Sequence, residues 1–102
     1  MLRIITLNLN GIRSATRKGF FDWLMRQEAD IVCLQELRAQ AGDLSRECLN
    51  PGGLFGYFHY AEKKGYSGVG LYSRRQPEQV IEGFGIPEFD AEGRYLEAVF
   101  GK

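Results

Sequence analysis

Hydrophobic and polar residues alternate over residues 2 to 10, and this period of two predicts a β-strand. Ile5 and Leu7 fall on one face, whereas the other face begins apolar and ends in two amides, Asn8 and Asn10. Because both faces begin apolar, we expect the strand to be covered on both sides near its start. A strand that only packs has little use for two amides at its tip, so this tip is the first candidate functional element.

A βαβ unit is predicted next. A broad apolar stripe predicts a helix over about residues 17 to 28, and the run "IVCLQE" at 31 to 36 is typical of an interior parallel strand. Such crossovers are almost always right-handed and make their two strands parallel. Parallel strands end at the same edge of a sheet. We therefore expect the amides of the first strand to lie close to Gln35 and Glu36, at the rim where α/β sheets bind ligands.

The rest of the chain predicts one more helix and then strands. Residues 39 to 49 fit a helix that "NPGG" ends. Four segments then resemble strands of an antiparallel meander: "YFHYAEK", "SGVGLYSR", "EQVIEGFG" and "RYLEAVF". The pattern predicts an α/β domain with a mixed β-sheet. Because no later segment could cover the last strand, we expect residues 1 to 102 to be a fragment of a single domain.

Composition limits the possible partners. The chain is 44% hydrophobic, which excludes a disordered tail, and its 13 basic and 13 acidic residues cancel, so nucleic acid could be met only by a local basic patch. Cys33 and Cys48 lie in apolar segments without metal-ligand spacing, which favours buried free thiols over a disulfide. The chain has neither a secretory signal nor an apolar run that could cross a bilayer. We expect a cytoplasmic protein with no membrane partner.

Glu36 is the strongest candidate for chemistry. It ends a buried run, and a carboxylate in such a place is costly unless it is paired or binds a metal. One glutamate beside the amide oxygens of Asn8 and Asn10 suits Mg²⁺, which prefers hard oxygen ligands, and suits zinc badly because no His or Cys is near. Alternatively, Glu36 pairs with Arg13 or Arg38 and the two asparagines are ordinary turn formers.

Basic and aromatic residues near this rim could bind nucleic acid. Arg13, Arg17 and Lys18 follow the asparagines within a few residues and could hold a phosphate backbone. Tyr66, at the tip of "KKGYSG", could stack on nucleotides. The alternatives are a solvated basic turn and a packing tyrosine. The single histidine, His59, is expected to be structural.

Four motifs in order carry a family resemblance: "TLNLNGIRSA", "ADIVCLQE", "GYSGVGLYSR" and "EGRYLEAVF". Together they resemble the N-terminal part of the exonuclease III family of DNA-repair nucleases, in the endonuclease/exonuclease/phosphatase superfamily. The resemblance implies a DNase I-like fold, a four-layer α/β sandwich with mixed β-sheets. It also implies an enzyme that uses Mg²⁺ or Mn²⁺ to cleave double-stranded DNA at abasic sites and to degrade it from 3′ ends, as a monomer when full length.

The resemblance also implies roles for residues at the strand rim. Glu36 of "LQE" matches the family's metal ligand. Asn8 matches an amide that organises the catalytic site, and Asn10 matches a position near the metal.

Four other residues match the family's DNA-binding positions. Arg13 of "GIR" and Lys18 of the following turn match residues that contact DNA phosphates. Gly65 and Tyr66 of "GYSG" match a loop on the DNA side.

The sequence also departs from the family pattern. The later motifs "GDxN" and "SDH" are absent, and "GDLS" at 42 to 45 has Ser45 where an asparagine is required. We therefore expect half of a metal site, with weak metal binding and little cleavage by these residues alone. Two alternatives are a non-catalytic relative that regulates RNA use, similar to the catabolite repression control protein, and a superfamily phosphatase. Glu36 and the turn "NGIRSATRKG" favour the DNA nuclease.

Overall fold

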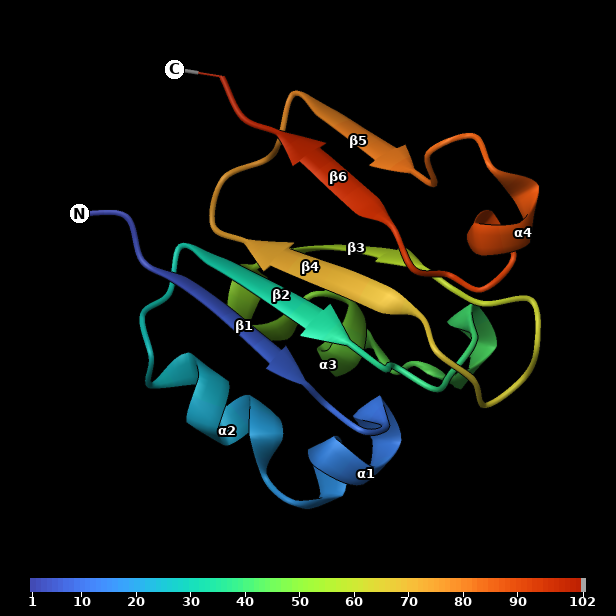
Figure 1. Ribbon diagram of the computed structural model, residues 1–102. Coiled ribbons are helices and arrows are strands. Elements are labelled where there is room, and N and C mark those ends of the chain that lie inside the picture. The colour runs from blue at the N-terminus through green and yellow to red at the C-terminus, as the bar shows by residue number, and fades with distance from the viewer. Residues whose placement is uncertain (102) are drawn as a thin grey trace.

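A mixed four-stranded sheet forms the centre of the protein in the computed structural model, which describes residues 1–101 (Figure 1). The strand order is β1 (Ile4–Asn8), β2 (Ile31–Gln35), β4 (Val69–Ser73) and β3 (Phe55–His59). β1 and β2 are parallel, and the other neighbours are antiparallel. The predicted α/β class, the mixed sheet and the parallel pairing of the first two strands are confirmed.

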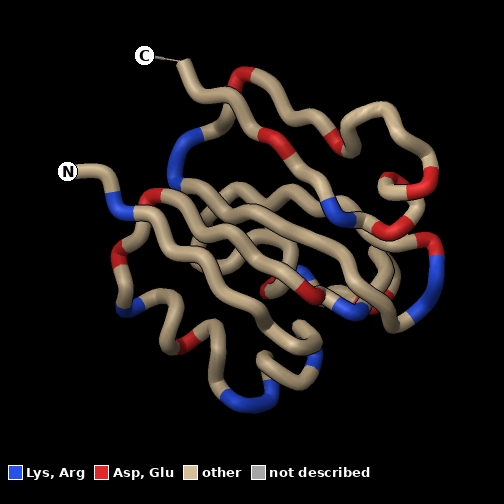
Figure 2. Tube along the Cα trace, viewed as in Figure 1, with Lys and Arg blue, Asp and Glu red and all other residues tan. Residues whose placement is uncertain are grey.

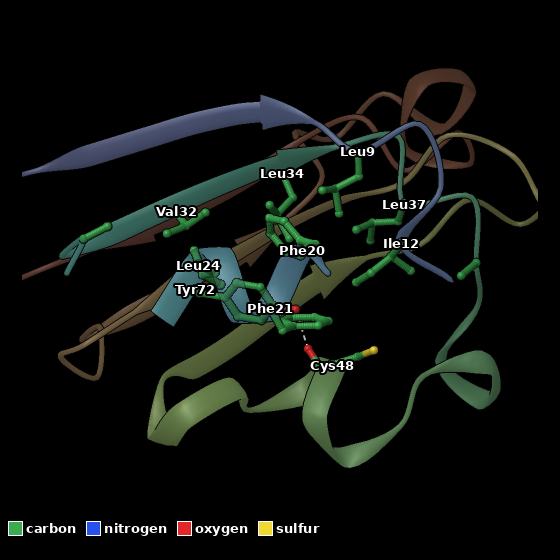
Figure 3. Close-up of a cluster of buried hydrophobic side chains, with 12 residues drawn as sticks. Leu9, Ile12, Phe20, Phe21, Leu24, Val32, Leu34, Leu37, Cys48 and Tyr72 are labelled. Atoms are coloured by element: carbon green, nitrogen blue, oxygen red, sulfur yellow. Dashed lines mark hydrogen bonds between the residues drawn. The ribbon is translucent and has the colours of Figure 1, made fainter. Parts of the chain in front are cut away.

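Helices cover one face of this sheet and enclose the core. They are α1 (Ile12–Arg17), α2 (Phe20–Met25) and α3 (Arg46–Leu49), with the 3₁₀ turns η1 (Ala41–Asp43) and η2 (Pro51–Gly53) beside α3. Figure 3 shows how Phe20, Phe21 and Leu24 of α2 pack toward Val32 and Leu34 of β2. None of the helices in residues 1–101 is long and apolar enough to cross a membrane.

The helix predicted over residues 17 to 28 is wrong in extent. Gly19 has a φ of 90°, in the left-handed region, and it separates α1 from α2. α2 then ends at Met25, and the side chains of Trp23 and Met25 stay 36% and 42% exposed instead of completing the apolar stripe. A glycine at this position allows the chain to turn, so that two short helices pack where one was expected.

The single helix predicted over residues 39 to 49 is also wrong, because the chain forms η1 and then α3. The Asp43 carboxylate accepts from the backbone N–H of Gln40 at 2.9 Å, and the Ser45 hydroxyl accepts from that of Cys48 at 3.3 Å. Short polar side chains compete for backbone groups in this way, so they cap helices more often than they continue them.

β5 (Gln79–Glu82) and β6 (Leu96–Val99) form a separate antiparallel ribbon, with α4 (Pro87–Asp90) between them in sequence. The predicted meander is therefore interrupted after β4: the antiparallel pairs β3–β4 and β5–β6 both form, but β5 does not pair with β4. The ribbon lies against β3 and β4 (Figure 1), and His59 Nδ1 hydrogen-bonds the backbone carbonyl of Tyr95 at 2.7 Å. The only histidine of the chain thus has a structural contact.

The beginning of β1 is covered on one side only. Leu2 and Ile4 are 66% and 55% exposed, whereas Ile5 packs against the core. The expectation that both faces of this strand are covered near its start is therefore wrong for residues 1–101. The ribbon of β5 and β6 reaches the β3 and β4 half of the sheet and leaves the β1 edge open.

A buried tyrosine ties the sheet to α3. The Tyr72 side chain is fully buried, and its hydroxyl donates to the backbone carbonyl of Cys48 (Figure 3). Burial raises the pKa of Tyr72, so the phenol stays neutral and remains a donor. Cys33 and Cys48 are both free thiols, as predicted, but only Cys48 is buried as expected and Cys33 is half-buried.

We expect Tyr72→Phe to lower the free energy of unfolding by about 1–2 kcal/mol, because the Cys48 carbonyl loses its donor in the core. Tyr57→Phe is the matched control, since among residues 1–101 the Tyr57 hydroxyl has no hydrogen-bond partner and the side chain is only partly buried. Urea denaturation of both variants measures the difference. Equal stability of the two variants would contradict a role for this hydrogen bond.

Candidate active site

The parallel register brings the tips of β1 and β2 together, as predicted. Asn8 lies opposite Gln35, and the ladder continues past the strands: Gly11 N–H donates to the carbonyl of Glu36, and Ile12 N–H to that of Leu37, both at 2.9 Å. Glu36 itself has a φ of 53°, an unfavourable conformation for a residue with a side chain. Strained backbone of this kind concentrates at functional sites.

The Glu36 carboxylate has a partner at each oxygen. Asn8 Nδ2 donates to Oε2, and the Arg38 guanidinium donates to Oε1 at 2.8 Å. The Asn8 amide oxygen in turn accepts from the backbone N–H of Asn10 at 2.8 Å, which fixes the orientation of the amide. The Asn8 hydrogen bond is the main cause that lowers the pKa of Glu36, Arg38 and Arg94 add to it, and partial desolvation opposes it. The carboxylate is therefore ionised at neutral pH.

Both readings of Glu36 offered by the sequence describe part of this geometry. The carboxylate lies beside the predicted Asn8, and it also pairs with Arg38, one of the two arginines named in the alternative. Asn10 contributes its backbone N–H to Asn8. Among residues 1–101, its side chain has no hydrogen bond to Glu36.

The donor chemistry fits a hard cation. An ionised carboxylate is the donor type that Mg²⁺ and Mn²⁺ prefer, whereas Asn8 turns its NH₂ group, not the predicted amide oxygen, toward Glu36. No group of three His, Cys, Asp or Glu residues that could hold a metal occurs within residues 1–101. Within these residues Glu36 is therefore a single candidate ligand, without the further carboxylates or histidines of a complete set. A cation bound here would share the carboxylate with Arg38 or displace it.

A small hollow of roughly 220 Å³ opens beside Glu36. It is lined by Glu36, Arg38, Tyr66, Ser67 and Arg94. Tyr66, predicted on the DNA side, comes from the loop between β3 and β4, and Arg94 comes from the turn before β6. Three segments that are distant in sequence therefore meet around the carboxylate.

A second, basic hollow of roughly 380 Å³ adjoins the first, with Arg38 in the lining of both. Its other lining residues are Gly11, Arg13, Ser14, Arg17 and Gly65, so it contains three guanidinium groups and no carboxylate. Arg13 donates to the backbone carbonyl of Arg38 at 3.1 Å and lies 3.9 Å from Asp43. The structure thus brings the predicted Arg13 and Gly65 together.

Lys18 lies elsewhere. It lines a third hollow at the edge of β1, together with Asn8, Gly19 and Trp23. Figure 2 shows basic residues at the turn between α1 and α2 and in the loop between β3 and β4. Lys18 thus shares a hollow with Asn8 but lines neither of the two hollows that contain Arg38.

Sequence reasoning missed the contributions of Arg38 and Arg94. Arg38 was considered only as an ion-pair partner of Glu36, although it also separates the two hollows. Arg94 was part of a recognised motif without a role. Its position in "EGRYLEAVF" is the signal that could have singled it out, because the motif is one of the four that carry the family resemblance.

Comparisons with known proteins agree with this geometry. The model of the endonuclease/exonuclease/phosphatase family matches residues 5–102. The chain is 42% identical over 100 residues to an exodeoxyribonuclease of Bacillus subtilis, a match that covers 97% of this chain and 38% of that protein. It is 30% identical over 95 residues to a DNA-(apurinic or apyrimidinic site) endonuclease of Dictyostelium discoideum, covering 93% of this chain and 26% of that one.

A solved structure agrees as well. An AP endonuclease from Archaeoglobus fulgidus matches with a TM-score of 0.78 and 30% identity, over 96% of this chain and 37% of that chain. The resemblance to exonuclease III and AP endonucleases and the fold class inferred from it are confirmed. The chain spans less than two-fifths of the length of each of these relatives.

Proposed function

Because this chain belongs to the endonuclease/exonuclease/phosphatase family, we propose that it is the N-terminal portion of a DNA-repair nuclease. In this proposal the whole protein is a monomer that hydrolyses phosphodiesters of double-stranded DNA at abasic sites and from 3′ ends. Two free thiols support a cytoplasmic location, since such thiols persist in a reducing compartment. The names of the relatives support the class of reaction, and residues outside this chain would complete the catalytic set.

One observation carries the proposal: an ionised glutamate, oriented by Asn8, beside a hollow lined by three arginines. In the proposed mechanism Glu36, with Asn10 near it, would hold Mg²⁺ or Mn²⁺, and the bound cation would supply polarisation of the scissile phosphate and activation of water. Asn8 keeps the carboxylate in place from one side and Arg38 from the other. Arg13 and Lys18 hold the DNA backbone through its phosphates, and Gly65 and Tyr66 face the same DNA.

A metal-dependent incision assay on the full-length protein tests this function. We expect cleavage of a duplex with one abasic site in Mg²⁺ and none in EDTA. Binding of RNA without any cleavage would favour the non-catalytic alternative. Release of phosphate from inositol phosphates, with the abasic duplex left intact, would favour the phosphatase.

We expect Arg13→Ala to weaken DNA binding by the full-length protein and to lower the slope of log K against log salt by about 0.9, the value of one phosphate contact. Arg26→Ala is the control, because Arg26 is an exposed arginine just after α2, outside both hollows beside Glu36. Fluorescence anisotropy in EDTA at several salt concentrations measures both variants. An unchanged slope for Arg13→Ala would remove Arg13 from the DNA interface.

A further inference from the structure

Tyr66 is held by partners from other parts of the chain, although it lies near the tip of a loop. The Arg94 guanidinium donates to the Tyr66 hydroxyl at 2.8 Å and lies 5.7 Å from the centre of its ring. The Lys63 ammonium lies 5.3 Å from the same ring. Two cations at this distance attract the aromatic face, and the hydrogen bond fixes the orientation of the phenol.

Arg94 is itself oriented by a second partner. Its Nε donates to Glu92 Oε1 at 2.6 Å, while its terminal nitrogen reaches Tyr66. A guanidinium held at two of its nitrogens has little freedom to rotate. Two hydrogen bonds therefore link the side chains in series, from Glu92 through Arg94 to Tyr66. This hydrogen-bonded chain ends at the hollow beside Glu36, which Arg94 and Tyr66 both line.

The turn that carries Arg94 is docked firmly on the end of β3. The backbone of Glu62 donates to the carbonyl of Ala91 at 2.8 Å, and His59 bonds the carbonyl of Tyr95 at 2.7 Å. Between these contacts, Gly93 has a φ of 61°, and a Cβ there would come within 2.6 Å of the backbone of Ala61. Contacts on both sides of Arg94 thus fix the backbone that carries its side chain.

We propose that Arg94 is a positioning residue that holds the Tyr66 ring in the orientation in which it contacts DNA, at the edge of the hollow beside Glu36. The proposal rests on the proposed function and adds a residue to its binding site. Because the phenol is already ordered, DNA binding does not have to order it, and affinity rises accordingly. Arg94 acts here through Tyr66 and does not neutralise a phosphate of its own.

The test is a double-mutant cycle on the full-length protein with an abasic-site duplex, measured as binding in EDTA. We expect Arg94→Ala to weaken binding about tenfold, within the range that stacking contacts contribute. Tyr66→Phe, which removes the acceptor of Arg94, also weakens binding, and the double variant binds no worse than Arg94→Ala alone. Because no phosphate contact is lost, the salt slope of Arg94→Ala equals that of the wild type.

Arg75→Ala is the matched control, because this arginine follows the end of β4 that lies away from Glu36 and donates to the carbonyl of Gly101. It should bind like the wild type. Additive losses, a salt slope lowered by about one, or unchanged binding by Arg94→Ala would each overturn the positioning role. If Arg94→Ala does not fold, Glu92→Gln takes its place in the cycle, since it removes the charge that orients Arg94.

Measurements on the wild type distinguish failure of the nuclease function from failure of the positioning role alone. If it neither binds nor incises the abasic duplex, the nuclease function and the role of Arg94 both fail. If it does both and Arg94→Ala matches it, only the positioning role fails.

Discussion

Glu36→Gln should reduce Mg²⁺-dependent cleavage of abasic DNA by the full-length protein at least about 100-fold, because a neutral amide is a poor ligand for a hard cation. The local geometry adds a second reason. Both carboxylate oxygens of Glu36 accept hydrogen bonds, from Asn8 and from Arg38. A glutamine has a single oxygen, so its NH₂ group would face one of these donors and disturb the site.

DNA binding in EDTA distinguishes a lost metal ligand from a damaged fold. We expect Glu36→Gln to bind the duplex at least as well as the wild type, because the change removes a negative charge beside the hollow lined by three arginines. Glu88→Gln, an exposed change on α4, controls for the loss of charge and should cleave normally. Near-normal cleavage by Glu36→Gln in millimolar Mg²⁺ would count against Glu36 as a metal ligand.

Gly56→Ala should lower the free energy of unfolding by about 3 kcal/mol, since β3 has no room for a methyl group there. A Cβ at this position would overlap the backbone carbonyl oxygen of Leu49, at the end of α3, and lie 3.2 Å from the ring of Tyr72. The obstacle is backbone, which cannot rotate away. α3 would have to move, and its hydrogen bond from Tyr72 to Cys48 would be strained.

Gly42→Ala is the matched control for this change. Nothing lies within 4 Å of a Cβ at Gly42, and its φ is not in the left-handed region. We expect its free energy of unfolding to remain within about 1 kcal/mol of the wild-type value. Replacing glycine by alanine at an unstrained position changes only the conformational entropy of the unfolded chain, and this effect is small. Thermal unfolding of both variants makes the comparison, and equal melting temperatures would show that α3 yields easily.

The meeting of Asn8 and Glu36 was predictable because it depends on a rule of connection. Alternation located β1, an apolar β-branched run located β2, and the helical crossover between them made them parallel. Once two strands are parallel, their carboxyl ends share an edge whatever the lengths of the helices between them. The two wrong helix predictions therefore did not affect the predicted meeting of Asn8 and Glu36.

The helix lengths and the pairing of β5 were harder to predict, because neither follows from periodicity alone. Gly19 tolerates a left-handed turn, yet a glycine can also be accommodated within a helix. β5 has the same alternation whether it pairs with β4 or β6. The choice depends on which surface the ribbon can cover, and that surface exists only once the sheet has formed.

Patterning along the chain is enough to establish the α/β class, the parallel βαβ unit, and the presence of a carboxylate, two amides and several cations near one sheet edge. Which of these groups touch became known from the folded arrangement: Asn8 and Arg38 at Glu36, Arg13 and Gly65 in one hollow, and Arg94 at Tyr66. The difference lies in the separation along the chain over which each kind of information acts. Patterning and chain connection act between neighbours, whereas a hydrogen bond between residues 66 and 94 requires two loops to be positioned by separate sheets.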